Sequence, residues 1–126
     1  MRDGLRRALE ERRRLREGVL AQARQFAEAV RRRLGRATVV LYGSYARGDF
    51  NLWSDVDVIV VSDAFSGVPP LRRYDLVMEA APPGFEVKLW TPEEARGAMA
   101  KPWWREALKR KVVLADDYGL FAREPP

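Results

Sequence analysis

The most informative stretch of the sequence, from Thr38 to Ser62, is TVVLYGSYARGDFNLWSDVDVIVVS. It opens with a β-branched, apolar run that ends at Gly43, which predicts a buried strand over 38–42 followed by a tight turn. A second run of the same character, over 55–61, predicts another strand. The short segment Tyr45-Ala46-Arg47 after the turn predicts one turn of helix. The stretch therefore predicts two strands of a core sheet.

The start of the second strand carries two acids, Asp55 and Asp57. Alternate side chains of a strand share a face, so these two carboxylates point the same way, with Cα atoms about 6.5–7 Å apart. Carboxylates this close repel each other unless a cation joins them, and Mg²⁺ prefers oxygen ligands. A pair of solvated acids at a strand edge is the alternative interpretation. The pair alone is weak support for a metal site.

The turn at Gly43 and Ser44 has features of a phosphate-binding turn. Glycine permits a tight turn and close backbone approach, and free N–H groups at a helix start suit phosphate oxygens. The Ser44 hydroxyl adds a donor, and Arg47 lies three residues further on. An ordinary connection between a strand and a helix has the same composition. The spacing to the acids decides between these interpretations.

Ten residues separate Ser44 from Asp55, which gives the pattern G-S-x10-D-x-D. This pattern resembles the signature of the minimal nucleotidyltransferases of the DNA polymerase β superfamily, in both its Gly-Ser-x-x-Arg-Gly and its Ser-Asp-x-Asp pieces. The resemblance covers 38–62 closely and extends more loosely to about residue 115. It implies Mg²⁺-dependent transfer of a nucleotidyl group, AMP from ATP, to an acceptor hydroxyl. It also implies that Gly43 and Ser44 cradle phosphates while Asp55 and Asp57 bind the metal.

The resemblance further implies a third acid on a neighbouring strand, for which Glu86 is the candidate. The run Phe85 to Trp90 predicts a strand with Glu86 and Lys88 on its polar face. The family more often has Asp at this position, so a metal ligand and a general base are both open roles for Glu86. Pairing of Glu86 with Lys88 on an exposed face is the alternative. Ser54 contacts phosphate in one interpretation and merely caps the start of the strand in the other.

The remaining pattern predicts an α/β (α+β) fold, with a mixed sheet flanked by helices. Apolar residues at helical spacing over 5–34 predict a long, basic, amphipathic N-terminal helix, whose first half overhangs the core and docks onto a partner or packs along the body. We expect helices over 71–80 and 103–109, a helix that starts with a capping box at Thr91, and a strand over 111–115. The tail 124–126 is expected to fray. We expect one nucleotidyltransferase domain over 1–126, with its helix at 1–35 and its core at 37–115.

Composition limits the chemistry that the chain can carry out. The 126 residues contain no cysteine and no histidine, which excludes disulfides, thiolate chemistry and the commonest general base. No apolar run reaches the length of a membrane span, and no signal peptide is evident, so we expect a cytoplasmic protein. The net charge of +5 divides into +7 over residues 1–36 (twelve Arg, five acids) and −2 over the rest. A basic segment binds nucleic acid, an acidic partner or phosphates, or is a solvated helix face.

The resemblance also suggests an acceptor. Minimal members of the family commonly pair with a small helical protein of the HEPN class, often as an antitoxin that adenylylates its toxin. The first hypothesis is therefore an enzyme that modifies a partner protein. The second is a non-catalytic or weakly catalytic module that neutralises the partner by docking. Transfer to a small-molecule hydroxyl and RNA binding through the Arg-rich helix are less favoured, and homo-oligomerisation stays open.

Overall fold

The core of the protein is a four-stranded mixed sheet, seen in a computed structural model that describes residues 2–121. The strands are β1 (Thr38–Tyr42), β2 (Val56–Val61), β3 (Phe85–Trp90) and β4 (Val112–Asp116), in the order β3-β2-β1-β4. β1 is antiparallel to both of its neighbours, and β2 is parallel to β3. The predicted mixed sheet is confirmed, and the predicted strand bounds are right within one residue.

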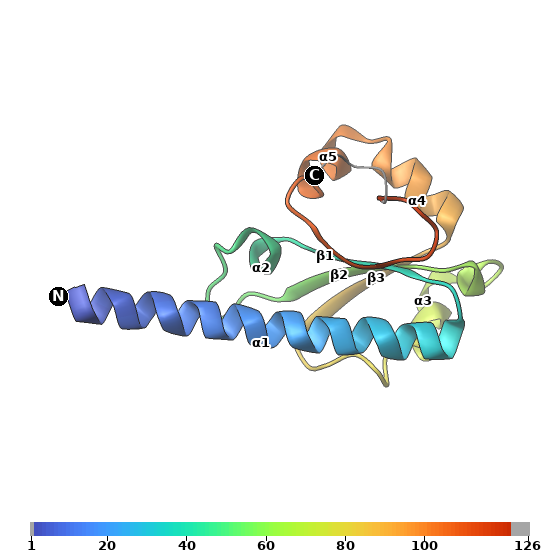
Figure 1. Cartoon of the computed structure of the whole chain (residues 1–126). Helices are drawn as coiled ribbons and strands as arrows, with labels where there is room; N and C mark the ends of the chain where they lie inside the picture. Colours follow the sequence, from blue (N-terminus) through green and yellow to red (C-terminus); the bar gives the residue numbers. More distant parts are fainter. Residues whose placement is uncertain (1, 122–126) are drawn as a thin grey trace.

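Helices cover both faces of this sheet (Figure 1). One face packs against α1 (Arg2–Leu34), and the other lies beneath α4 (Pro92–Met99) and α5 (Pro102–Ala107). Short segments complete the fold: α2 (Ser44–Arg47), α3 (Pro70–Arg73) and the 3₁₀ turns η1 (Asp63–Phe65) and η2 (Tyr74–Leu76). Within residues 2–121, we find no helix with the length and apolar character that crossing a lipid bilayer requires.

Strand alternation divides the apolar side chains between two cores. The larger core joins Phe26 and Val30 of α1 to Val58, Val60 and Val87 of the sheet. The smaller core, on the opposite face, contains Val40, Tyr42, Ile59, Ala95 and Leu108. Because successive strand residues point to opposite faces, each of the two central strands contributes to both cores.

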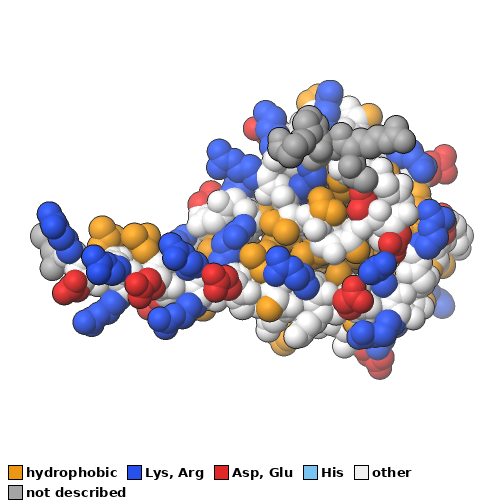
Figure 2. Space-filling model, in the orientation of Figure 1, with side chains coloured by type: hydrophobic (Ala, Val, Ile, Leu, Met, Phe, Trp, Pro, Cys, Tyr) orange, Lys and Arg blue, Asp and Glu red, His pale blue; other side chains and the backbone are white. Residues whose placement is uncertain are grey.

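The N-terminal half of α1 extends beyond the body of the protein, as Figures 1 and 2 show. The buried residues of α1 begin at Leu20, whereas Leu5 and Leu9 are 64% and 55% exposed. The sequence left open whether this half overhangs the core or packs along it, and the structure shows the overhang. The apolar stripe of the helix thus continues past the part of the helix that the core covers.

The end of α1 is joined to the segment after β4 through Asp117. Its carboxylate accepts two hydrogen bonds from the Arg31 guanidinium, both 3.1 Å, and one from the backbone N–H of Ala37 at 3.0 Å. These bonds hold the pKa of Asp117 below its ordinary value, with the Ala37 bond as the largest cause. Residues far apart in sequence therefore close the fold at one corner.

The predicted helix over 71–80 is wrong. α3 ends at Arg73 and is followed by the 3₁₀ turn η2, while Leu71 and Met78 of the expected apolar stripe are 85% and 47% exposed. Val77 of that stripe is buried, and so is Arg73, whose guanidinium donates to the Val68 and Leu89 carbonyls and to both Glu94 oxygens. One of the two side chains that anchor this segment is thus charged, and apolar spacing could not reveal it.

The helix predicted after Thr91 is confirmed as α4. The Thr91 side chain accepts a hydrogen bond from the Glu94 N–H, and the Glu94 carboxylate accepts one from the Thr91 N–H, which completes the capping box. Such reciprocal bonds satisfy two donors that a helix start leaves free. The helix expected over 103–109 forms as α5, shifted by one residue at its start and two at its end. The tail 124–126 lies outside the described residues.

Candidate active site

The register of the sheet brings the predicted acids together. Asp57 of β2 pairs with Tyr42 of β1 on one side and with Glu86 of β3 on the other, so the three residues form a row across the sheet. Asp55 lies just before β2, two residues from Asp57. The parallel pairing of β2 with β3 sets this arrangement, because it aligns the starts of both strands.

The electrostatics of this row centre on Asp57. Its pKa is raised, first by burial and then by the negative charges of Glu86 and Asp55, while Lys88 and Arg47 act in the opposite direction. Burial raises the pKa of the Tyr42 hydroxyl too, and Asp57 and Glu86 add to the effect. A group of negative charges that disfavour one another is stabilised when a cation binds among them.

Gly43 places the predicted phosphate-binding turn directly against Asp57. It has φ of +78°, in the left-handed region, and a Cβ at this position would lie 2.3 Å from Oδ2 of Asp57. That distance is far below van der Waals contact, so a larger residue would displace the carboxylate or the turn. Glycine is thus required here by both backbone conformation and close approach. The turn and the acid therefore form one site.

The segment after Gly43 forms the expected helical turn, α2. The Arg47 N–H donates to the Gly43 carbonyl at 3.0 Å, and the Gly48 N–H donates to the Ser44 carbonyl at 2.8 Å. The first N–H groups of a helix have no partner within it, so those of this turn point outward from its start. The Arg47 guanidinium is exposed, pairs with Asp49 at 3.2 Å and lies near enough to lower the pKa of Asp57.

Ser54 takes part in a local turn. Its hydroxyl accepts a hydrogen bond from the Asn51 N–H at 2.9 Å, and its N–H donates to the Asn51 carbonyl at 3.1 Å. These contacts match the interpretation in which Ser54 caps the start of the strand. The structure places the residue beside Asp55 and gives it a structural task in the connection that leads to β2.

Glu86 occupies an edge strand and is exposed. Lys88, two residues on, lies on the same face and is partly buried. Over residues 2–121, no three His, Cys, Asp or Glu side chains lie close enough together to form a ready metal-ligand group. The donor chemistry nevertheless fits a hard dication, which prefers oxygen ligands. The carboxylates of Asp55 and Glu86 both raise the pKa of Asp57, and Glu86 lies one strand away from it.

Two arginines missed by the sequence analysis reach this site from α1. Arg16 donates to the carbonyls of Tyr45 and Ala46, at 2.8 and 3.0 Å, and Arg12 donates to those of Gly48 and Phe50. Arg12 and Arg16 lie on the same side of the helix as the apolar stripe. The sequence did contain a signal for these two residues: they form an i,i+4 pair of arginines at positions where the helical periodicity predicts apolar residues.

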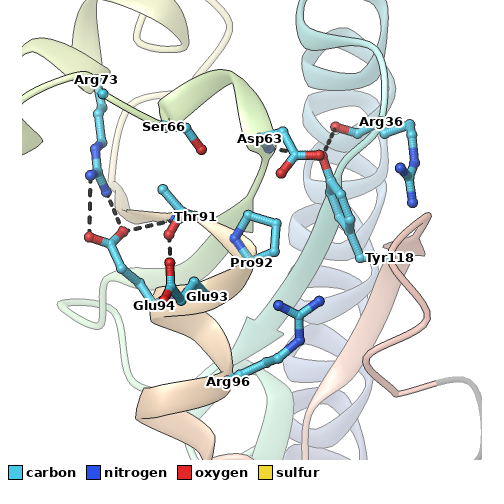
Figure 3. Close-up of a pocket in the computed structure, with 11 residues that line it drawn as sticks. Arg36, Asp63, Ser66, Arg73, Thr91, Pro92, Glu93, Glu94, Arg96 and Tyr118 are labelled. Atoms are coloured by element: carbon cyan, nitrogen blue, oxygen red, sulfur yellow. Dashed lines mark hydrogen bonds and ion pairs between the residues drawn. The ribbon is translucent and has the colours of Figure 1, made fainter.

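A separate pocket of about 660 Å³ lies at the opposite end of the sheet (Figure 3). Several of its polar groups are paired with one another. Arg73 bonds both oxygens of Glu94, which also accepts from Thr91, and the Tyr118 hydroxyl accepts from the Asp63 N–H at 2.8 Å. These contacts join helix, sheet and loop, whereas the acids around Asp57 raise its pKa instead of pairing with cations within residues 2–121.

Fold and site together define a nucleotidyltransferase: a mixed sheet carries paired acids beside a glycine turn. Residues 23–114 match the family model of the nucleotidyltransferase domain, and the chain belongs to this family. A crystal structure of a "putative nucleotidyltransferase" from Sulfolobus solfataricus has the same fold, with a TM-score of 0.58, 21% identity and 84% of each chain covered. No curated protein is significantly similar in sequence. The family match begins within α1, so the overhang precedes it.

Proposed function

We propose that residues 1–126 act as one domain that transfers AMP from ATP to a hydroxyl of a partner protein, in a Mg²⁺-dependent reaction. The observation that carries this proposal is the contact between the Gly43 turn and Asp57, in a row with Glu86. A phosphate-binding turn and metal-binding acids must lie together to hold a triphosphate on a dication. Here the glycine of one touches the carboxylate of the other.

Each residue of the site has a proposed task. The N–H groups after Gly43 and the Ser44 hydroxyl bind the terminal phosphates, and Arg47 adds a positive charge at the same end of the turn. Asp55, Asp57 and Glu86 would hold Mg²⁺, which supplies charge neutralisation between the triphosphate oxygens when bound. Catalysis then depends on positioning and electrostatics, as in phosphoryl transfer generally.

Glu86 has a second proposed task, as the base that takes the acceptor proton. It is the exposed member of the row, whereas Asp57 is partly buried. A carboxylate at the open edge of the sheet can contact an incoming hydroxyl more readily than one beneath the turn. Ser54 is the weakest member of the proposed nucleotide site, because its hydroxyl is engaged by Asn51.

The overhang of α1 supports a protein acceptor. It presents Leu5 and Leu9 on a helix that the core does not cover, which suits docking of a second helical protein. A small partner of the HEPN class, as in toxin–antitoxin pairs, fits this requirement. Nucleic acid is the less favoured partner, since acidic residues interrupt the arginines along the overhang.

Co-expression with a neighbouring HEPN-type protein tests the proposal. Intact-mass spectrometry should show the partner gaining one AMP mass in the presence of ATP and Mg²⁺. Asp57→Asn should abolish the gain, while Asp75→Asn, the same change at an exposed acid on η2, should leave it unchanged. A partner that is neutralised yet unmodified, equally by wild type and Asp57→Asn, would show that the chain acts by docking alone.

A further inference from the structure

We propose that Arg12 and Arg16 of α1 are positioning residues that hold the turn after β1, residues 43–50, in its nucleotide-binding conformation. This inference rests on the proposed function and assigns to that site two residues outside the motif. Both precede residue 23, where the family match begins. The segment that they hold, residues 43–50, is called the clamped turn below.

Hydrogen bonds form the first part of the argument. The Arg16 guanidinium donates through Nε to the Tyr45 carbonyl and through a terminal nitrogen to the Ala46 carbonyl. One planar group thus bridges two consecutive carbonyls, which a single ammonium cannot do with the same geometry. Arg12 adds bonds to the carbonyls of Gly48 and Phe50. Four backbone acceptors of the clamped turn therefore bind side chains of one helix.

The arginines bind one particular end of α2, the end where its carbonyl groups have no partner within the helix. The carbonyl groups at the end of a helix carry partial negative charge, and cations there are stabilising. The arginines take the carbonyl end of this short turn, while its N–H end begins at Ser44, beside Gly43 and Asp57. Holding one end of the turn fixes where the other end points.

Aromatic packing completes the clamp. The Arg12 guanidinium lies 4.6 Å from the centroid of the Phe50 ring, which stacks on Tyr45 at 4.3 Å with an interplanar angle of 12°. Phe50 is only 4% exposed, although the residues that follow it, Leu52 and Trp53, are 82% and 90% exposed. The clamp therefore ends where the exposed part of the connection to β2 begins.

The anchor of the clamp is the buried half of α1. Leu20, Ala23 and Phe26 pack in the larger core, directly C-terminal to Arg16 along the helix. The arginines thus transmit the fixed position of α1 to a turn that has few regular hydrogen bonds of its own. Preorganising a binding loop increases affinity because less order has to be imposed on binding.

Substitutions of Arg16 test the clamp at two levels. Arg16→Gln should raise the hydrogen-exchange rate of amides within residues 43–50, measured without nucleotide by mass spectrometry. It should also weaken binding of ATP with Mg²⁺ by about tenfold in titration calorimetry. In transfer assays KM should rise more than kcat falls, because the turn holds phosphates in ground and transition states alike.

Matched variants separate geometry from charge and folding. Arg13→Gln removes the same charge from an exposed position on the same helix and should change neither exchange nor affinity. Arg16→Lys keeps the charge but not the fork, so it should show most of the defect. Thermal unfolding should show that both Arg16 variants remain folded.

The outcomes distinguish the clamp from the proposed function. Unchanged exchange over 43–50 in Arg16→Gln, or affinity equal to that of Arg13→Gln, would overturn the clamp. If wild type itself bound no nucleotide, the proposed function would fail, and the exchange measurement would still decide whether Arg16 holds the turn. A fall in stability alone, with KM and affinity unchanged, would leave Arg16 a structural residue and refute the proposal.

Discussion

At Gly43 the backbone approaches Asp57 so closely that a side chain has no room, and this contact yields a sharp prediction. Gly43→Ala should abolish nucleotide binding, because its Cβ would lie 2.3 Å from the Asp57 carboxylate. Calorimetric titration with ATP and Mg²⁺ measures the loss. Gly67→Ala is the control: Gly67 also has positive φ, +74°, but it has open space around the Cβ and lies outside residues 43–50. Both changes cost about 1–2 kcal/mol in backbone strain, so only the first should lose binding.

A second prediction for a single residue is that replacing Asp57 stabilises the protein while it removes activity. Its raised folded-state pKa means that the charged carboxylate destabilises the protein above the ordinary pKa of 3.8. Without divalent cation, Asp57→Asn should therefore raise the melting temperature at neutral pH and give no gain below pH 3.8. Transfer activity should fall on the order of a hundredfold or more. A variant that melts lower than wild type at neutral pH would contradict this account.

Among single residues, the sequence predicted those of the G-S-x10-D-x-D motif but not the residues that hold the motif in place. Gly43, Ser44, Asp55 and Asp57 could be predicted because their chemistry is encoded over a short interval. Placing Glu86 opposite Asp57 required the pairing of β2 with β3, which no local pattern fixes. Arg12 and Arg16 escaped because their partners lie 29 to 38 residues away in the chain.

Among the elements, the connection between β2 and β3 holds the edge of the sheet through charged and polar groups. Arg73 and the Tyr74 hydroxyl donate to the Leu89 and Val87 carbonyls of β3, at 3.0 and 3.1 Å. Arg73 is buried and is joined to Glu94 of α4, whose side chain is 45% exposed. An apolar period cannot predict a segment held in this way, which explains why the expected helix over 71–80 was wrong.

The ion pair between Arg73 and Glu94 gives a prediction about the stability of the protein. Hydrogen bonds from Arg73, then from the Thr91 backbone, hold the Glu94 pKa below its ordinary 4.5. Its stabilisation is thus present above about pH 4.5 and is lost as pH falls through the folded-state pKa. Glu94→Gln should lower the unfolding free energy at pH 7 by about 1–2 kcal/mol, at the low end because water screens Glu94. Urea unfolding measures this difference, which should shrink below pH 4.5.

The neighbouring Glu93 provides the matched control for that experiment. Glu93→Gln removes the same charge from the first turn of α4, where Glu93 is exposed. It should change the unfolding free energy by no more than the few tenths of a kcal/mol expected of an exposed acid near a helix start. Equal effects of the two substitutions would show that helix-end charge, and not the pairing with Arg73, accounts for the stabilisation.

For the molecule as a whole, the overhang separates partner binding from folding. Deleting residues 1–11 should leave the melting temperature and ATP affinity close to wild type, because Leu5 and Leu9 are exposed and Arg12 is retained. The same deletion should weaken association with a HEPN-type partner, measured by co-purification and calorimetry. A large loss of thermal stability would show instead that the overhang belongs to the folded core.

The global shape was only partly predictable. Alternation of strands and helices indicated a mixed sheet, and the amphipathic stripe indicated a long helix. How far that helix projects depends on where the sheet ends beneath it. The stripe resumes at Leu5 and Leu9 beyond Arg12 and Arg16, so apolar spacing alone does not show where the core stops covering the helix.

The contacts that Asp117 makes with Arg31 and Ala37 can form only late in the synthesis of the chain. Ala37 and Asp117 are 80 residues apart, so at about 5–20 residues per second the ribosome needs on the order of ten seconds between them. Throughout that interval the newborn helix exposes Phe26 and Val30 without their full cover. The many arginines of this helix keep it hydrated during that interval, so its charge favours solubility before the fold is complete.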